Sequence, residues 1–299
     1  MDIAISLNLF VDRGDPLELI PRVAAAGFEG DFPFFDLLST IDWSDERAAH
    51  RLVDAWGEAG QRAGLRWVQS HGPIFNMFCR TAADAQAKAM CAVGLRASGK
   101  LGVRWMVLHP DVFAGPPDAG HRRAVLQANA AFFRELLPVC EENGTGIAIE
   151  NLFDAIGQED QRGCDWYFGA RAEELCELID AVNHPLVGAC WDTGHARIMK
   201  ADQRSSLAML GPRLKALHIQ DNDGGGDDHL LPFAVGRAGV DWNAVIAGLR
   251  DAKYPGPFTY EVHKAFAAIP EALYDETLAY AAKIGRHLAD AASQTVSDT

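Results

Sequence analysis

Short β-rich runs alternate with longer helical patterns along the whole 299-residue chain, and this alternation constrains the fold more than any other feature. Alternation of this kind is typical of β-α-β units built around a parallel sheet. Since there are eight repeats, the pattern favours a closed (β/α)₈ barrel over an open doubly wound sheet. The strand candidates are residues 3–8, 28–32, 65–70, 103–109, 145–150, 186–192, 213–219 and 257–262.

Each strand candidate precedes a segment with apolar residues at helical spacing, as in Leu126, Ala130, Phe133 and Leu137. We therefore expect one α/β domain over residues 1–299, a (β/α)₈ TIM barrel, with a frayed tail over residues 292–299. The expected helices are 16–26, 46–63, 82–101, 121–143, 171–182, 202–210, 242–252 and 270–290. Glycines that suit left-handed helix caps end four of them: Gly27, Gly64, Gly102 and Gly144.

The composition narrows the classes of partner. The chain carries 41 acidic and 27 basic residues, a net charge of -14, so nucleic acid held mainly through phosphate neutralisation is an unlikely partner. Its six cysteines form no CxxC pair and no dense secreted-type framework, which indicates reduced thiols in a cytoplasmic protein. We expect neither an export signal nor a membrane span, because no apolar run is long enough.

Metal-binding residue types stand at the expected carboxyl ends of six successive strands. In barrels of this kind those ends surround the catalytic mouth. Period-two alternation places the small residue Ala148 on the same face as Glu150, while Ile147 and Ile149 face the helices. The six residues are His71, His109, Glu150, Asp192, His218 and Glu261.

Four of these residues, Glu150, Asp192, His218 and Glu261, form the predicted metal site. Any one of them could be a solvated strand-end residue or an arginine partner, but three carboxylates in one place would repel without a cation. The oxygen-rich donor set suits Mn²⁺, Mg²⁺, Co²⁺ or Zn²⁺ better than a thiolate-selected metal. We expect one such divalent metal ion.

Short motifs at the strand ends make the chain resemble the sugar phosphate isomerase/epimerase family, the xylose isomerase-like TIM barrels that also include endonuclease IV. The resemblance covers about residues 1–285. The motifs are His-Gly-Pro (71–73), Leu-His-Pro (108–110), Ile-Glu-Asn (149–151), Trp-Asp-Thr-Gly-His (191–195), His-Ile-Gln-Asp-Asn-Asp (218–223), Asp-Asp-His-Leu-Leu-Pro (227–232) and Tyr-Glu-Val-His (260–263).

The ketose 3-epimerase branch of this family implies a function and roles for the site residues. One divalent ion would be held by the four predicted ligands, with Glu150 and Glu261 also serving as catalytic acid and base. His195 and Arg237 would contact oxygens of the substrate, although Arg237 also fits a surface salt bridge. The resemblance thus predicts a metal-dependent isomerase or epimerase that moves a proton in a sugar or sugar-like keto compound through a metal-stabilised enediolate.

Several alternatives remain open at the level of sequence. The endonuclease IV branch implies a trinuclear zinc phosphodiesterase, and suitable residues occupy all nine of its ligand positions, so up to three ions are possible. The same enediolate chemistry also allows a dehydratase of a keto-acid, and a non-catalytic sugar-binding or accessory protein is a third class. A homo-oligomer is possible. The nine positions are His71, His109, Glu150, Asp192, His195, His218, Asp227, His229 and Glu261.

Overall fold

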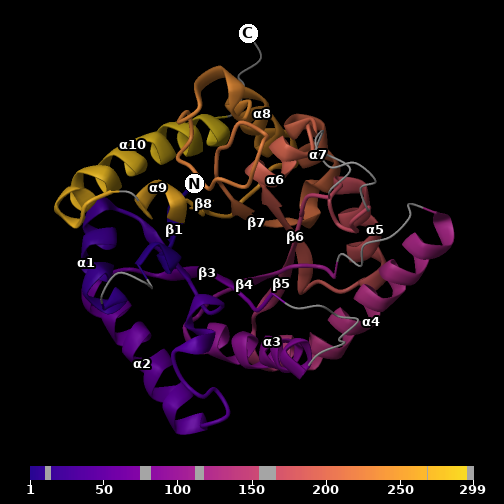
Figure 1. Ribbon diagram of the computed structural model, residues 1–299, viewed down its shortest axis with the longest axis horizontal. Helices are drawn as coiled ribbons and strands as arrows, with labels where there is room; N and C mark the ends of the chain where they lie inside the picture. The colour runs from indigo at the N-terminus through magenta and orange to yellow at the C-terminus, as the bar shows by residue number, and fades with distance from the viewer. Residues whose placement is uncertain (11–14, 75–81, 112–117, 155–165, 268, 295–299) are drawn as a thin grey trace.

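Eight parallel strands stand at the centre of the molecule and helices surround them (Figure 1). The computed structural model describes residues 1–10, 15–74, 82–111, 118–154, 166–267 and 269–294. Neighbouring strands follow the order of the chain from β1 to β7, and β8 pairs with β1. The strands are β1 (Ile3–Ser6), β2 (Glu29–Phe32), β3 (Trp67–His71), β4 (Trp105–Leu108), β5 (Gly146–Glu150), β6 (Val187–Asp192), β7 (Leu214–His218) and β8 (Phe258–Tyr260).

Hydrogen bonds between the seventh and eighth strand regions close the sheet into a barrel. The main-chain N–H of Ile219 donates to Thr259 O at 2.8 Å, and that of Glu261 donates to Ile219 O at 3.1 Å. The expected single (β/α)₈ TIM barrel is therefore confirmed. The strands are shorter than we expected, so His109 and Glu261 lie one residue beyond β4 and β8.

The helices agree with the sequence expectation in order and approximate extent. The side chains of Asp45 and Asp241 accept hydrogen bonds from main-chain N–H groups in the first turns of α2 and α8, which explains where these helices begin. None of the helices among the described residues is long and apolar enough to cross a membrane. The helices are α1 (Pro16–Ala26), α2 (Glu46–Ala63), α3 (Ala82–Lys100), α4 (Ala119–Asn143), α5 (Ala172–Val182), α6 (Thr193–Ile198), α7 (Gln203–Leu210), α8 (Trp242–Ala252), α9 (His263–Ala267) and α10 (Tyr274–Ser293).

Two short helices and one helix end differ from the expectation. The sequence pattern did not indicate α6, which follows β6 directly, or α9, which is separated from the end of β8 by two residues. α10 runs to Ser293, so the first residues of the expected tail are helical and Ala292 is buried. Residues 295–299 of that tail lie outside the described residues.

Side chains on the strands separate into an inner and an outer core, as period-two alternation predicts. Val107, Ala148, Cys190 and Ala216 form a small buried cluster inside the barrel. Their neighbours along the strands, Ile147 and Ile149 among them, belong to the larger apolar layer between sheet and helices. These small side chains fill the narrow interior of the barrel. The polar residues at the carboxyl ends of the strands lie above them, at the mouth.

Candidate metal centre

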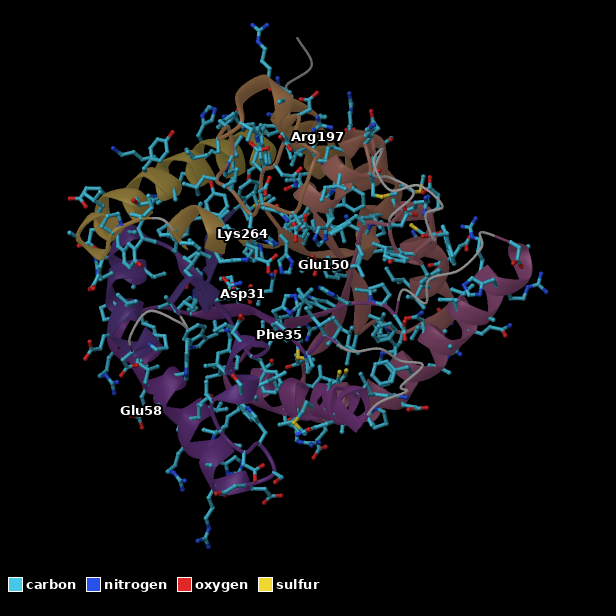
Figure 2. The ribbon with its side chains drawn as sticks, viewed as in Figure 1. Asp31, Phe35, Glu58, Glu150, Arg197 and Lys264 are labelled. Atoms are coloured by element: carbon cyan, nitrogen blue, oxygen red, sulfur yellow. The ribbon has the colours of Figure 1, made fainter. Side chains whose placement is uncertain are left out.

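The four predicted metal ligands meet at the carboxyl ends of the strands. Glu150 and Asp192 are the last residues of β5 and β6, His218 ends β7, and Glu261 follows β8 directly. Each offers a ligand atom, and these atoms all lie within 4.8 Å of one another. All four side chains are buried, and Figure 2 shows Glu150 near the centre of the ring of helices. The arrangement follows from the sheet register, in which Asp192 pairs with His218.

His218 lies between the two glutamates. Its Nδ1 atom is 3.0 Å from Glu150 Oε1 and 3.3 Å from Glu261 Oε2. These close contacts lack the alignment of hydrogen bonds: among the described residues neither ring nitrogen of His218 nor Oε2 of Glu150 forms one, although all three atoms are buried. Buried polar atoms normally form hydrogen bonds, and a metal ion is another way to satisfy them. The donor set and these three atoms fit a divalent cation.

Mutual electrostatics shift the protonation of the four ligands. Burial alone would lower the pKa of His218, but the Glu150 and Glu261 carboxylates raise it to about 10. Burial opposes ionisation of both glutamates, yet His218 and its neighbours hold the pKa of each below the usual value. Burial raises the pKa of Asp192 to about 6, against the effect of His195. Protonated histidines thus balance the carboxylates, and a cation would replace those protons.

His71 and His109 lie on the other side of Glu150. Their Nε2 atoms are 3.7 Å and 3.2 Å from Glu150 Oε2, and the three residues form a second group with metal-ligand spacing. Nδ1 of His71 lies 2.8 Å from the Gly72 carbonyl and donates to it, which leaves Nε2 without a proton in the neutral ring. The His71 ring also stacks on that of His218. Both histidines are placed to bind an additional ion or a substrate.

His195, Asp227 and His229 form an ion-paired chain beside the four ligands. The main-chain N–H of His195 donates to Asp192 Oδ1 at 2.6 Å, and its Nδ1 lies 2.8 Å from Asn151 O. Its Nε2 is 3.5 Å from Asp227 Oδ1, while His229 Nε2 is 2.8 Å from Asp227 Oδ2. Burial opposes the ionisation of Asp227, but the two histidines hold its pKa far below the usual value. These hydrogen bonds and ion pairs hold charged side chains in fixed positions at the mouth of the barrel.

Arg237 lies apart from this cluster. It is exposed in a 3-10 turn, Gly236–Ala238, and is not among the described residues that line the mouth cavity. The arginine that contacts this loop is Arg197, whose Nε and Nη2 atoms donate hydrogen bonds to Ala238 O at 3.1 and 2.8 Å. A contact between Arg237 and substrate stays a prediction.

A cavity of about 280 Å³ opens above the metal-binding residues. Sequence reasoning missed five of its lining residues, and a signal existed only for His263, which ends one of the motifs. No Lys or Arg of the described residues lines this cavity. The lining residues are Asn8, Phe35, Asp36, His71, Ile74, His109, Glu150, His195, Asp227, His229, Glu261 and His263.

Gln220 is a further polar residue that the sequence did not single out. Its Nε2 donates to Asp227 Oδ1 at 2.7 Å and to Asp192 Oδ2 at 3.3 Å, and its Oε1 accepts from the main-chain N–H of His229. One buried amide therefore orients three residues of the site. It connects the four-ligand cluster to the ion-paired chain.

Asp31 on β2 lies fully buried, and neither of its carboxylate oxygens has a hydrogen-bond partner among the described residues. Burial raises its pKa to about 7, although His218 and His71 act in the opposite direction. Figure 2 labels Asp31 inside the ring of helices. The site thus includes a fourth buried carboxyl group that the strand-end pattern did not reveal.

Comparison with known proteins identifies the family. The family described as xylose isomerase-like TIM barrel matches residues 20–284, and the chain belongs to it. A curated protein of Sinorhizobium fredii, described as uncharacterized protein y4fM, is 31% identical over 180 residues. That match covers 58% of this chain and 52% of the relative, so the chain spans about half of the relative's length.

Solved structures share the fold at low sequence identity. A xylose isomerase domain protein from Alicyclobacillus acidocaldarius is 21% identical with a TM-score of 0.71, covering 98% of this chain and 100% of that one. D-psicose 3-epimerase from Clostridium cellulolyticum, solved with D-tagatose, is 18% identical with a TM-score of 0.71 and coverage of 96% and 99%. The IolI protein, solved with a zinc atom, is 17% identical with a TM-score of 0.72 and coverage of 99% and 100%.

Proposed function

We propose that this protein is a divalent-metal-dependent isomerase or epimerase of a sugar or sugar-like keto compound. The observation that carries the proposal is the position of Glu150 and Glu261 on either side of His218, each within 3.3 Å of its Nδ1 atom. Two carboxylates at one metal-binding cluster provide a base and an acid for proton transfer next to a carbonyl. The fold is compatible with many reactions, so the argument depends on this site.

Asp192, His218 and the two glutamates are the residues that would hold the ion. A bound divalent ion would act as a Lewis acid and lower the cost of the negative charge that develops on the substrate oxygen during enolisation. The donor set suits Mn²⁺, Mg²⁺, Co²⁺ or Zn²⁺. The zinc atom in the IolI structure supports a metal in this class of site.

A histidine lies close to the carboxylate of each glutamate. Glu150 Oε2 lies 3.2 Å from His109 Nε2, and Glu261 Oε2 lies 3.6 Å from His229 Nδ1. The pKa values of both glutamates are held below the usual value, so both are ionised at neutral pH, which is the form a general base needs. Because β5 and β8 stand three strands apart in the barrel, the two carboxylates can serve opposite faces of a substrate, as epimerisation requires.

The substrate class follows from the cavity above the ligands. The similar D-psicose 3-epimerase was solved with D-tagatose, and this supports a ketose-like substrate. Phe35 and Ile74, both exposed at the rim, offer an apolar surface to one side of a sugar ring. We assign His195 to substrate binding, since this residue lines the same cavity.

A trinuclear phosphodiesterase is the second candidate, favoured by the group of His71, His109 and Glu150 with metal-ligand spacing. Its nucleic-acid substrate would carry negative charge along the mouth. The described cavity lining offers no Lys or Arg to that charge, and the net charge of the chain is -14. These observations favour the isomerase.

The decisive experiment measures exchange of substrate C–H with deuterated solvent over a panel of free ketoses, in protein loaded with Mn²⁺. We expect exchange in the native protein and a loss of at least a hundredfold in Glu150→Gln and Glu261→Gln. Glu58→Gln is the matched control, because Glu58 lies on the outer side of α2, far from the label of Glu150 in Figure 2. Unchanged exchange in both site variants would contradict the proposal.

A further inference from the structure

A second cavity lies at the end of the barrel opposite the mouth. Its volume is about 900 Å³, and its lining comes from the starts of β3, β4, β7 and β8 and from the ends of α2 and α3. Cavities that bind small organic ligands typically measure about 300–1,000 Å³ and combine an apolar lining with a few charged or polar groups. The proposed function involves only the mouth, so it gives this second cavity no role.

The charged residues that line the second cavity are all basic, although the chain has a net charge of -14. They are Arg66, Lys100, Arg104 and Lys215. Arg66 and Lys100 form ion pairs with acidic side chains outside the lining. Arg104 and Lys215 have no acidic side chain within 4 Å in the described part of the chain, and Arg104 donates only to a main-chain carbonyl, Gly144 O. Two positive charges at this cavity therefore lack a partner of opposite sign.

A register shift between β6 and β7 directs Lys215 toward the cavity. Consecutive residues of β6 pair with Leu214 and Ala216, so Lys215 is an extra residue in β7. Extra residues of this kind change the direction in which a strand side chain points. A Cβ atom on Gly188 would collide with Cγ of Lys215, so the lysine stem lies over β6, where Gly188 leaves room for it. The half-buried Lys215 is thus a built feature of the barrel floor.

Trp105 separates the second cavity from the interior of the barrel. Its half-buried ring packs against the inner core, and a Cβ atom on Gly146 would collide with it. Nζ of Lys215 lies 5.7 Å from the centre of this ring, and Cζ of Arg104 lies 5.5 Å from it. Contacts of a cation with an aromatic face stabilise the position of the cation. The two unpaired charges are therefore held beside one aromatic ring.

We propose that this cavity binds a small organic anion whose phosphate or carboxylate group contacts Lys215 and Arg104. Arginine offers a planar fork of donors to such oxygens, and lysine offers a compact charge. The apolar part of the ligand lies against the half-buried side chains of Trp105, Leu101 and Pro257. The inference goes beyond the proposed function and does not depend on it, because none of the described lining residues belongs to the metal centre.

The test titrates the full-length protein at low salt with adenosine monophosphate, adenosine and inorganic phosphate, using isothermal titration calorimetry. Adenosine monophosphate combines an organic ring system with a phosphate, and each of the other two probes lacks one of these parts. We expect adenosine monophosphate to bind with a Kd of about 1 mM or below. Adenosine and inorganic phosphate should each bind about tenfold more weakly or worse, because each loses one set of contacts.

Lys215→Met keeps the apolar stem and removes the charge, so it should weaken binding of adenosine monophosphate about tenfold. Arg104→Gln should have a similar effect, and it keeps the inference testable if Lys215→Met does not fold, because Arg104 is exposed. Lys283→Met, at an exposed position on α10 outside the lining, is the matched control and should bind like native protein.

Titrations in chelator and in Mn²⁺ separate this cavity from the mouth, and we expect the same affinity in both. Binding that requires Mn²⁺ would place the probe at the metal centre and overturn the inference. The inference also fails if adenosine monophosphate shows no saturable binding, if either partial probe binds as tightly, or if folded Lys215→Met and Arg104→Gln bind like native protein. Failure of the exchange experiment at the mouth would overturn the proposed function alone.

Discussion

Asn151 and Asp192 hold each other by two reciprocal hydrogen bonds across the ends of β5 and β6. The main-chain N–H of Asp192 donates to Asn151 Oδ1 at 2.6 Å, and Asn151 Nδ2 donates to Asp192 O at 3.0 Å. Asn151 follows Glu150 directly, so this amide fixes the backbone of one candidate ligand relative to another. Both residues are completely buried, which makes the two bonds costly to lose.

Replacing Asn151 by Leu should therefore weaken metal binding without removing any ligand. We expect the affinity for Mn²⁺ or Zn²⁺, measured by isothermal titration calorimetry, to fall tenfold to a hundredfold, which is typical of lost partners behind a metal site. Asn243→Ala, at an exposed position in α8, is the control. Equal metal affinity in Asn151→Leu and native protein would show that the two hydrogen bonds between Asn151 and Asp192 do not position Asp192 for metal binding.

The barrel and its ligands could be predicted because they depend on local periodicity. In β5, one residue in two is small and the others are branched, so Ala148 and Glu150 had to share a face. Parallel strands bring their carboxyl ends to one side, and this places Glu150 near Asp192 without any knowledge of tertiary contacts. The position of the predicted cluster thus follows from the strand count and the alternation.

The positions of the site residues that the sequence did not reveal depend on features that periodicity does not encode. Asn8 and His263 are 255 positions apart, and they meet only because barrel closure sets β1 beside β8. Asp31 lies where the register between β2 and β3 shifts, so alternation along Glu29–Phe32 gave no reliable face. Gln220 sits in a loop after β7, where no repeating pattern indicates direction.

The stability of the metal-free protein should fall as the pH rises from about 7 to 10. The folded state raises the pKa of His229 to about 9 and of His218 to about 10, whereas the contribution of Asp31, whose pKa is raised to about 7, is lost below this range. A group whose pKa is raised binds more protons in the folded than in the unfolded state, so its contribution is present at low pH and lost as the pH passes the folded value. Thermal unfolding in chelator across this range measures the fall.

Metal loading gives the matched comparison for this pH dependence. Bound ions require neutral imidazole and ionised carboxylates, so the midpoint of unfolding in excess Mn²⁺ should stay level or rise with pH over the same range. His218→Gln should reduce the fall seen in chelator, since of the two histidines it removes the one with the higher pKa. A midpoint in chelator that is level between pH 7 and 10 would contradict the assignment of protonated histidines.

Ala148 tests how tightly the inner core of the barrel is filled. It is completely buried beside Val107, Cys190 and Ala216, two residues before Glu150 on the same face of β5. We expect Ala148→Leu to reduce the free energy of unfolding by about 1–3 kcal/mol, the usual cost of overpacking. Ala279→Leu on the exposed face of α10 is the control, and urea denaturation compares the two. Equal stability of the two variants would mean that the interior has spare volume.

Gln203 provides a test of stability that is separate from metal binding. Its Oε1 accepts from Trp191 Nε1 at 2.8 Å, and its Nε2 donates to Thr193 O at 2.8 Å, so one buried side chain links α7 to the end of β6. Gln203→Leu leaves the buried Trp191 Nε1 without its acceptor and removes one hydrogen bond from Thr193 O, and a buried unpaired group costs about 1–3 kcal/mol. We expect the free energy of unfolding to fall accordingly, while exposed Gln61→Leu has little effect.

The isosteric variant Gln203→Glu separates the two bonds of this side chain. Its carboxylate still accepts from Trp191, but at neutral pH it has no proton to donate to Thr193 O, and its charge is buried. When the carboxyl is protonated at lower pH, the donor returns and the charge is lost. We therefore expect the stability deficit of Gln203→Glu, relative to native protein at the same pH, to shrink as the pH falls from 7 to 5. The deficit of Gln203→Leu should stay constant over that range, and a deficit of Gln203→Glu that is equally constant would contradict this prediction.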